Sequence, residues 1–507
     1  MKNIVVCCDG TWNTPTETEG GLPNPTNVVK IYNALARDDR QSAYYHPGVG
    51  TGKGWWDHLI GGGVGDGLDQ NTMSAYRWLA RNYRAGDRIF TFGFSRGAYT
   101  TRSLGGLIAR YGLLDLTAPD LDAAAQWGRV GEVFAAYRSR APFANAAGYP
   151  FHNAAAGQAP AQTTPIHFVG VWDTVGALGI PDDLPLLGLF DNVEKYQFHD
   201  TALSRVVKNA RHAVALDERR ASFAPTLWSV VDPATDAKQL WFPGVHGDVG
   251  GGYLQTGLSD GALLWMIEEA EACGLLLRNG IKTQIKPDPL GVAHDSCDGV
   301  FKFLKTKPRS APPLKKDDVA LHQSASARLE SPPLSQGEYW STTVLAAGAA
   351  HTVEVFARER WNVTGVYLEA GARYDFKAVG EWIDQDDKFS PAGKEPQGFH
   401  FGDVARFASS MLGGLETTYK ALAQQKNVDF WWTRRDEASP WFALMGFIAS
   451  DLGATDAALP KGEMFEIGET KSYVPQRGGY LYCFANDAWQ TYGNNRGGVT
   501  LTIARAA

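Results

Sequence analysis

A serine between two glycines is the feature of this 507-residue chain best suited to covalent chemistry. The segment Gly93-Phe94-Ser95-Arg96-Gly97 fits the pattern G-x-S-x-G. A β-prone run precedes it and a helical pattern follows it, which is the strand–turn–helix setting that exposes a nucleophilic hydroxyl. The helix N-terminus would favour negative charge beside Ser95, and the backbone N–H of Arg96 would donate to an oxyanion. A structural serine in a tight turn is the alternative.

A serine hydroxyl needs a base to remove its proton, and a glycine-rich stretch at residues 241–253 offers His246. His246 follows a strand-like run, and the neighbouring glycines would let its imidazole approach the serine closely. His212 is the competing base, but it begins a strand-like run instead of following one. We therefore expect His246 to be the general base.

Two aspartates that each end a strand-like run, Asp173 and Asp217, compete to orient the imidazole. Both follow the serine and precede the histidine, which is the order Ser…Asp…His. Arg219 and Arg220 stand next to Asp217 and could hold it in a structural ion pair. We favour Asp173 for this reason and keep Asp217 as the alternative acid.

The second oxyanion donor should come from the loop after the first strand, where Asp9-Gly10-Thr11 stands. Gly10 would permit a close approach, and Thr11 offers both an N–H and a hydroxyl. An ordinary β-turn is the alternative. The residues thus predict oxyanion donors at Thr11 and Arg96, and this chemistry requires no cofactor.

Short apolar strands alternate with helical patterns in the first half of the chain. This alternation predicts an α/β fold with a doubly wound, mostly parallel sheet that is covered on both faces. In such sheets function collects at the carboxyl ends of the strands. The expected strands are 4–8, 42–46, 88–92, 166–171, 212–216 and 239–242, and the expected helices are 27–36, 69–83, 97–110 and 259–273.

The chain exceeds the size of a single core, so we expect two domains. Residues 1–335 would form the catalytic domain, with an inserted cap at about 115–164. Residues 305–333 are rich in Pro, Lys and Ser, which indicates a linker or surface segment. Residues 345–507 contain alternating strand-like runs, which predict a β-sandwich with a helical insertion at about 401–441.

Composition narrows the possible functions. The net charge is −7 and no Lys/Arg cluster occurs, which argues against nucleic-acid binding. The five cysteines are odd in number and lack CxxC spacing, so a zinc site or a disulfide framework is not expected. The first apolar run ends at Asp9, too early for a signal peptide, and no stretch is long and apolar enough to span a membrane.

Five motifs in this order resemble the catalytic domain of type VI secretion lipase effectors of the first family. They lie at residues 7–13, 93–98, 171–175, 217–220 and 242–248, and the resemblance covers about residues 1–335. It implies an α/β-hydrolase fold, a Ser-Asp-His triad and phospholipase activity on membrane glycerophospholipids. It also implies synthesis in the bacterial cytoplasm, secretion by a type VI system to target-cell membranes, and an immunity protein or secretion-system component as partner.

The segment 486–498 is similar to the closing calcium loop of bacterial galactose-binding lectins. The resemblance implies that one Ca²⁺ ion binds the side chains of four residues and a backbone carbonyl near Asp384. Calcium prefers several oxygen ligands, which a short Asx- and Thr-rich loop can supply, although a plain turn is the alternative. A glycan is a further expected ligand, but the loop that completes the lectins' sugar site has no counterpart here. The four side-chain ligands are Asp487, Thr491, Asn494 and Asn495.

Three functions follow as hypotheses. The first is a phospholipase, in which the apolar segment 184–190 would either contact acyl chains or belong to the core. The second is a carbohydrate esterase targeted by its lectin-like domain. The third is a non-catalytic carbohydrate-binding protein with an inactive hydrolase domain.

Overall fold

The computed structural model describes most of the chain between Met1 and Ala507. The residues outside the description are 11–17, 20–21, 49–63, 144–145, 155–163, 177–202, 229–230, 299–304, 316–317, 334–341, 385–386, 395–433, 451–461 and 490. The predicted acyl-chain segment 184–190 and most of the predicted insertion 401–441 lie there. So does the predicted domain boundary between 335 and 345, which stays a prediction.

A six-stranded sheet in which all strands are parallel forms the first part of the chain, in the order β4-β1-β5-β6-β7-β8. This confirms the predicted α/β fold. His212 does not begin a strand as predicted, because β7 starts five residues earlier and His212 lies in its middle. The strands are β1 (Asn3–Cys8), β4 (Gln41–His46), β5 (Arg88–Phe94), β6 (Ile166–Trp172), β7 (Val207–Ala215) and β8 (Asp236–Phe242).

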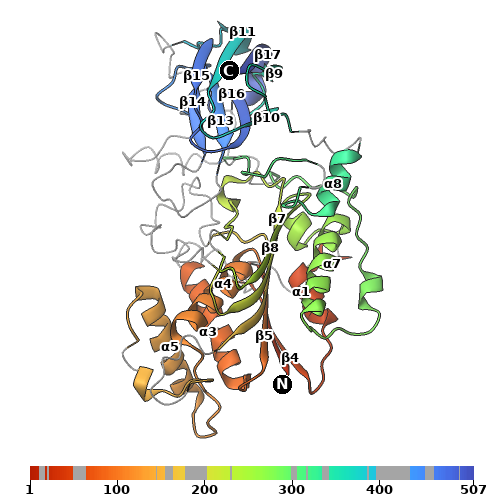
Figure 1. The fold of residues 1–507 in the computed structure, drawn as a ribbon, viewed down its shortest axis with the longest axis vertical. Helices are drawn as coiled ribbons and strands as arrows, with labels where there is room; N and C mark the ends of the chain where they lie inside the picture. The colour runs from red at the N-terminus through yellow and green to blue at the C-terminus, as the bar shows by residue number, and fades with distance from the viewer. Residues whose placement is uncertain are drawn as a thin grey trace, which may run out of the picture.

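Helices cover both faces of this sheet (Figure 1). In β1, Ile4 and Val6 pack toward α3 and α4, whereas Val5 and Cys7 pack toward α1 and α7. Successive strand residues point to opposite faces, so a strand buried on both faces is apolar throughout. The helices are α1 (Asn27–Ala34) and α7 (Gly257–Ala272) on one face, and α3 (Val64–Asn82) and α4 (Arg96–Tyr111) on the other.

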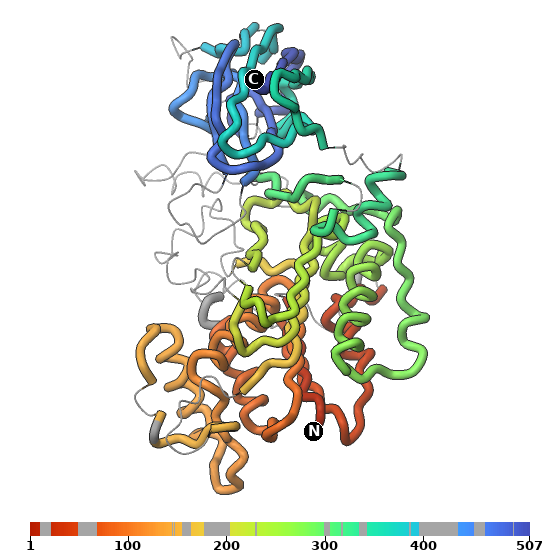
Figure 2. Tube along the Cα trace, viewed as in Figure 1, coloured from red at the N-terminus to blue at the C-terminus, as the bar shows by residue number. Residues whose placement is uncertain are grey.

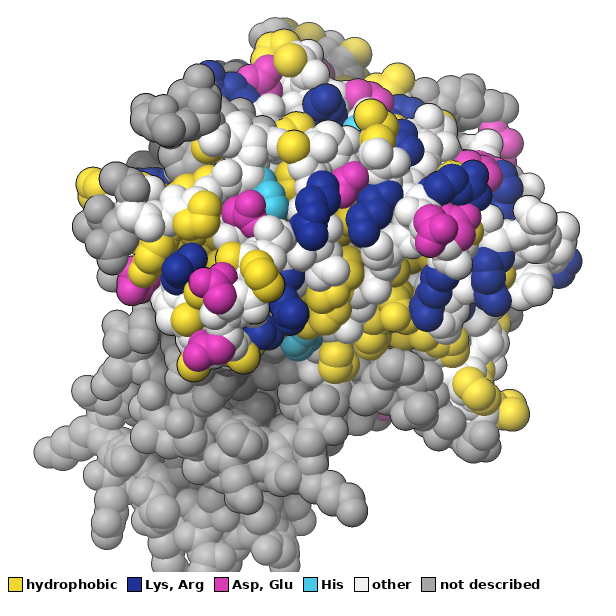
Figure 3. All heavy atoms as spheres, turned by 90° about the horizontal axis from the view of Figure 1, so that it is seen from below, with side chains coloured by type: hydrophobic (Ala, Val, Ile, Leu, Met, Phe, Trp, Pro, Cys, Tyr) yellow, Lys and Arg dark blue, Asp and Glu magenta, His cyan; other side chains and the backbone are white. Residues whose placement is uncertain are grey.

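The remaining elements of this part are short or lie outside the main layers. The helix α5 (Ala123–Ser139) falls in the predicted cap and packs on α3 and α4. No helix in the described ranges is long and apolar enough to cross a membrane. On the face shown in Figure 3, Lys and Arg side chains are interspersed with Asp and Glu. The other elements are β2 (Thr18–Glu19), β3 (Leu22–Pro23), α6 (His246–Gly250) and α8 (Gln323–Glu330).

Two antiparallel sheets make up the C-terminal part, which confirms the expected β-rich architecture. Their facing sides share one core around Trp382, Phe442 and Leu481. One sheet has the order β10-β16-β13-β14, the other β12-β11-β17-β9, with β15 paired to β11. The strands are β9 (Ala350–Phe356), β10 (Asn362–Leu368), β11 (Tyr374–Asp384), β12 (Asp387–Phe389), β13 (Leu444–Ala449), β14 (Glu463–Glu466), β15 (Thr470–Tyr473), β16 (Gly479–Ala485) and β17 (Asn495–Arg505).

The outer face of the sheet that contains β13 and β16 packs against the α/β part. Met445 and Phe447 of β13 share an apolar cluster with Tyr480 and Tyr482 of β16 and with Trp241 of β8. Figure 2 shows the C-terminal strands next to the chain that follows the α/β part, and far from the N-terminus. Both faces of this sheet are therefore buried.

The segment 305–333, predicted to be a linker or surface segment, is partly buried between these two parts. Arg309 and Ser310 are 5% and 3% exposed. Further along, Leu321 forms a parallel bridge with Trp241 of β8, the last strand of the sheet. Covering this edge with chain protects its unpaired backbone groups, which explains why a Pro- and Lys-rich sequence is ordered here.

The junction between β5 and α4 depends on two glycines. A Cβ atom on Gly97 would lie 2.1 Å from the carbonyl oxygen of Cys8 and 2.5 Å from that of Asp9. A Cβ atom on Gly93 would lie 2.5 Å from the carbonyl oxygen of Gly97. Gly97 therefore lets the turn approach the end of β1, and Gly93 lets the first turn of α4 lie close to the end of β5.

We predict that Gly97→Ala lowers the free energy of unfolding by at least about 1–3 kcal/mol, because the new methyl group overlaps backbone atoms that cannot move aside. The matched control is Gly128→Ala in α5, where a Cβ atom meets nothing within 4 Å. The control should raise stability by up to about 1 kcal/mol, since alanine favours the helix. Urea unfolding measures both changes. Equal stability of the two variants would contradict the close approach.

Candidate active site

Ser95 occupies a strained turn at the carboxyl edge of the parallel sheet. Its backbone has φ 58° and ψ −122°, a left-handed conformation that non-glycine residues rarely adopt. Its N–H donates to the carbonyl oxygen of Trp172 at the end of the neighbouring strand β6, at 3.1 Å. The side chain stands at the N-terminus of α4, as the sequence pattern predicts.

Asp173 and His246 come together beside this turn. Asp173 follows β6 directly, and His246 is the first residue of α6, in the loop after β8. The distance from His246 Nδ1 to Asp173 Oδ2 is 2.6 Å, and both side chains are buried. The rings of Phe94 and Phe223 lie 4.6 and 5.0 Å from the imidazole and fix its position. The imidazole thus has one nitrogen committed to a carboxylate.

Ser95 and Asp173 end adjacent strands, and Phe94, which packs on the imidazole, precedes Ser95 directly. Within the described part of the structure, Ser95 and His246 make no hydrogen bond to each other. Such bonds are often long until a substrate is bound. The three residues therefore share one edge of the sheet, with the bond between the acid and the histidine already formed.

Arg309 is the residue of this site that sequence reasoning missed. Its Nη1 and Nη2 donate to Asp173 Oδ1 and Oδ2 at 2.6 and 2.9 Å. Nη1 also donates to the carbonyl oxygen of Ala215, and Nη2 to that of Phe223. Arg309 lies in a segment without a motif or a periodic pattern, so the sequence offered no signal for its role.

Burial and charge set the protonation states of the pair. Burial raises the pKa of Asp173, but the charge of Arg309 and the hydrogen bonds from His246 and Arg309 outweigh it, so the pKa lies well below its ordinary value. For His246, burial lowers the pKa, and the hydrogen bond to Asp173 opposes this only in part. Near neutral pH, Asp173 is an anion and His246 is neutral, as a general base must be.

Asp217 and His212, the alternative acid and base, contact other parts of the structure. Asp217 Oδ2 accepts from the backbone N–H of Gly244 at 2.6 Å and so ties two loops together. His212 accepts from the N–H of Thr174 at 3.2 Å, and its other nitrogen lies 3.0 Å from Gln239. Burial lowers the pKa of His212 to about 3. The structure therefore brings Asp173, and not Asp217, to His246.

The predicted oxyanion donors are described only in part. Arg96 is the first residue of α4, and its side chain is buried, which together with the charge of Arg220 lowers its pKa to about 10. Thr11 lies outside the described residues. Just before it, the Gly10 N–H donates to Asp9 Oδ1, and Asp9 Oδ2 accepts from Thr26 and Tyr45. The start of this loop is thus tied to β4 and to the N-terminus of α1.

Glu218 is a second buried carboxylate near the imidazole. It accepts from the backbone N–H of His246 at 3.3 Å, from Ser296 Oγ at 2.8 Å and from the side chain of Arg220. Burial raises the pKa of Glu218, but the hydrogen bonds and charge of Arg220 lower it to about 2. Glu218 therefore anchors the loop that carries His246.

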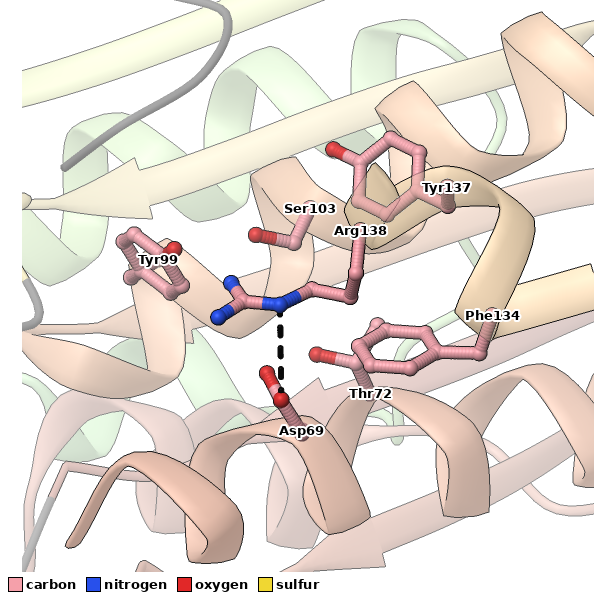
Figure 4. A pocket seen from close by; sticks show the side chains of 7 residues that line it. All are labelled: Asp69, Thr72, Tyr99, Ser103, Phe134, Tyr137 and Arg138. Atoms are coloured by element: carbon pink, nitrogen blue, oxygen red, sulfur yellow. Dashed lines mark ion pairs between the residues drawn. The ribbon is translucent and has the colours of Figure 1, made fainter. Parts of the chain in front are cut away.

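A small pocket between α3, α4 and α5 lies apart from these residues (Figure 4). Arg138 of α5 points across it to Asp69 of α3, with 3.5 Å between Nε and Oδ2. The pocket contains neither Ser95 nor Asp173 nor His246, so we place the active site at the sheet edge. Its other lining residues are Thr72, Tyr99, Ser103, Phe134 and Tyr137.

The five residues expected to bind calcium lie together at one end of the C-terminal sandwich. Asp384 and Asn495 are paired across β11 and β17, and Asn494 donates to Asp384 at 2.8 Å. Asn495 donates to Asp487 at 2.8 Å, and Thr491 also hydrogen-bonds to that carboxylate. Among the described residues, no group of three His, Cys, Asp or Glu side chains could hold a metal, so amide and hydroxyl oxygens would have to complete the site.

Parts of the chain are similar to known proteins. An uncharacterized protein of Saccharomyces cerevisiae is 31% identical over 239 residues, which are 44% of this chain and 32% of that protein. The chain thus spans about a third of that relative. An uncharacterized Pseudomonas aeruginosa protein of known structure is 17% identical, with a TM-score of 0.31, over 57% of this chain and 49% of that chain.

Two further solved structures were found. A Tle1 effector bound to the VgrG spike of the type 6 secretion system is 18% identical, with a TM-score of 0.31, over 50% of this chain and 52% of that chain. A lectin, the N-terminal domain of EclA, is 16% identical, with a TM-score of 0.18, over 30% of this chain and 94% of that chain. These TM-scores are too low to support an argument. The family model of the T6SS phospholipase effector Tle1-like catalytic domain, however, matches residues 2–269, more than half of the chain, and the chain belongs to this family.

Proposed function

We propose that this protein is a serine hydrolase that cleaves acyl esters of membrane glycerophospholipids. Its family is that of type VI phospholipase effectors, which gives the general class. The observation that carries the finer proposal is the buried hydrogen bond of 2.6 Å between Asp173 and His246, next to a serine in a strained turn. This arrangement has the parts that acyl transfer requires.

Each residue has a distinct task in the proposed reaction. The hydroxyl oxygen of Ser95 attacks the ester carbonyl while His246 accepts its proton and then passes it to the departing alcohol. Asp173 keeps a proton on His246 Nδ1 and stabilises the imidazolium. Backbone N–H groups of Arg96 and Thr11 stabilise the oxyanion, and water then releases the fatty acid from Ser95.

The setting of this activity is also a proposal. The enzyme would be made in the bacterial cytoplasm. A type VI secretion system would then deliver it to the membranes of target cells. An immunity protein would protect the producing cell, and a secretion-system component would carry the enzyme. The C-terminal sandwich would bind a glycan or another docking partner.

We predict that Ser95→Ala lowers fatty-acid release from glycerophospholipid vesicles by about 10³- to 10⁶-fold, because no other group can form the acyl intermediate. Ser103→Ala, two turns further along the same helix, should keep its activity. Release of fatty acid is measured by titration, and labelling of Ser95 by a fluorophosphonate supplies an independent readout.

The same assay separates the alternatives. Release of acetate from acetylated sugars without release of fatty acid would favour a carbohydrate esterase. Equal rates for the wild type and Ser95→Ala on both classes of ester would favour a non-catalytic binding protein.

We predict that Asp173→Asn lowers kcat by about 10⁴-fold, because an amide favours the wrong tautomer of His246. Asp217→Asn should retain most of the activity, since Asp217 contacts the N–H of Gly244 instead. Comparable losses in both variants would contradict the assignment of the acid.

We predict that kcat/KM falls with acid below the ordinary histidine pKa of about 6.5, because burial lowers the pKa of His246 and only neutral His246 can accept a proton. Activity should therefore persist at mildly acidic pH and vanish as the imidazole becomes charged. A pH profile of kcat/KM checks this. If kcat/KM already falls with acid above pH 7, at the acid limb of the profile, the prediction is wrong.

The C-terminal residues fit a calcium ion. Asn495 is 3% exposed, and its Oδ1 is buried without a hydrogen-bond partner. Burial and the charges of Asp487 and Asp387 raise the pKa of Asp384 to about 6, so a cation would relieve the repulsion. We propose that Asp384, Asp487, Thr491, Asn494 and Asn495 hold the ion, which would tie β11 to the loop before β17 and take no part in ester cleavage.

We predict that calcium at about 100 times its Kd stabilises the wild type by about 2.7 kcal/mol, whereas Asp487→Asn shows little stabilisation. Asp375→Asn on the opposite end of β11 is the matched control and should respond like the wild type. Thermal unfolding with calcium and with a chelator measures the difference. Equal shifts in all three proteins would contradict the site.

A further inference from the structure

Arg309 contacts both carboxylate oxygens of Asp173, the proposed catalytic acid. Its planar guanidinium binds both oxygens of Asp173, whereas Nδ1 of His246 is bound to Oδ2 alone. The backbone N–H of Ala215 donates to Oδ1 at 2.9 Å. The carboxylate is therefore held at a fixed angle by donors on two sides, and the imidazole meets it in one orientation.

Through its bonds to Asp173, Arg309 should also influence the protonation of His246. An anion shared with a guanidinium stabilises an imidazolium less than an anion bound to His246 alone. Arg309 should therefore keep His246 neutral at lower pH. The other charged groups around His246 are Glu218, which favours protonation, and Arg220, which opposes it. Among the described residues, the neutral ring of His212 also lies near Asp173, and the charge of Arg102 helps to lower the pKa of that ring.

The C-terminal sandwich holds the chain that carries Arg309. Ala311 and Leu314 pack in the same apolar cluster as Phe447 and Tyr482 of the sandwich. The N–H of Leu314 donates to the hydroxyl of Tyr480 at 2.6 Å. The hydroxyl of Thr342 donates to the carbonyl oxygen of Leu314 and also hydrogen-bonds to the hydroxyl of Tyr480. Only four residues thus separate Arg309 from Leu314, which is fixed to the sandwich.

We propose that Arg309 is a positioning residue for Asp173 and that the C-terminal sandwich keeps it in place through Leu314. This inference rests on the proposed function, because it assigns a task within the same reaction. It makes the sandwich a structural support of the active site in addition to any docking role.

The first test compares Arg309→Met with Arg309→Lys in the full chain, using pH profiles of kcat and kcat/KM. Arg309→Met should lower kcat about 10- to 100-fold and move the acid limb of kcat/KM upward by about 0.5–1 pH unit. Arg309→Lys keeps the charge but not the planar pair of bonds. It should lower kcat while leaving the limb in place.

The outcomes are distinct. A loss of kcat in Arg309→Met without movement of the limb, or a failure of both variants to fold, would assign Arg309 a purely structural role and overturn the proposal. Wild-type rates in both variants would overturn it too. If Ser95→Ala releases fatty acid as fast as the wild type, the proposed function itself fails. The outcomes that overturn only the role of Arg309 leave the dependence of activity on Ser95 intact.

The second test addresses the sandwich. Tyr480→Phe removes the hydroxyl that accepts from Leu314 and also bonds to Thr342, and it should lower kcat about 2- to 10-fold at unchanged KM. The matched control is Tyr374→Phe, which removes a hydroxyl bonded to Glu369 within the sandwich. The control should leave kcat unchanged. Equal rates in the two variants would overturn the role of the sandwich.

Discussion

A buried carboxylate, that of Asp173, constrains much of the surrounding structure. It is 0% exposed, and an ion in such a place must be matched by charge and hydrogen bonds. Arg309, His246 and the N–H of Ala215 supply them from three separate segments of the chain. Because removing one partner would leave the charge only partly compensated, the geometry of the site depends on all three segments. Asp173 therefore links the proposed active site to the packing of the chain beyond the sheet.

The parallel sheet was predictable because its strands are buried on both faces and are bounded by turns. All six predicted strands are present, and the pattern around Ser95 located the turn between β5 and α4. The sequence favoured Asp173 over Asp217 but could not decide between them, since both end a strand-like run and both precede His246. Only the fold separates them, because β6 lies beside β5 whereas β7 is one strand further away.

The role of Arg309 was not predictable for a different reason. Proline and lysine in the segment 305–333 are typical of exposed chain, and nothing in the sequence shows what covers it. The segment is ordered by contacts with residues more than a hundred positions away, such as Tyr480. The residue pattern within the segment does not indicate such long-range contacts. The residues proposed to bind calcium were easier to group from the sequence, because four of the five stand within one short loop.

The sheet of β13 and β16 has apolar side chains on both faces, one toward its partner sheet and one toward the α/β part. A sandwich cut from the chain would expose Met445, Phe447 and Tyr482 to water, and such a surface favours aggregation. The interface also raises the free energy of unfolding either part alone, because unfolding one part would expose the apolar surface of the other to water. The enzyme should consequently lose its structure on heating in one cooperative transition, in contrast to modules joined by a free tether.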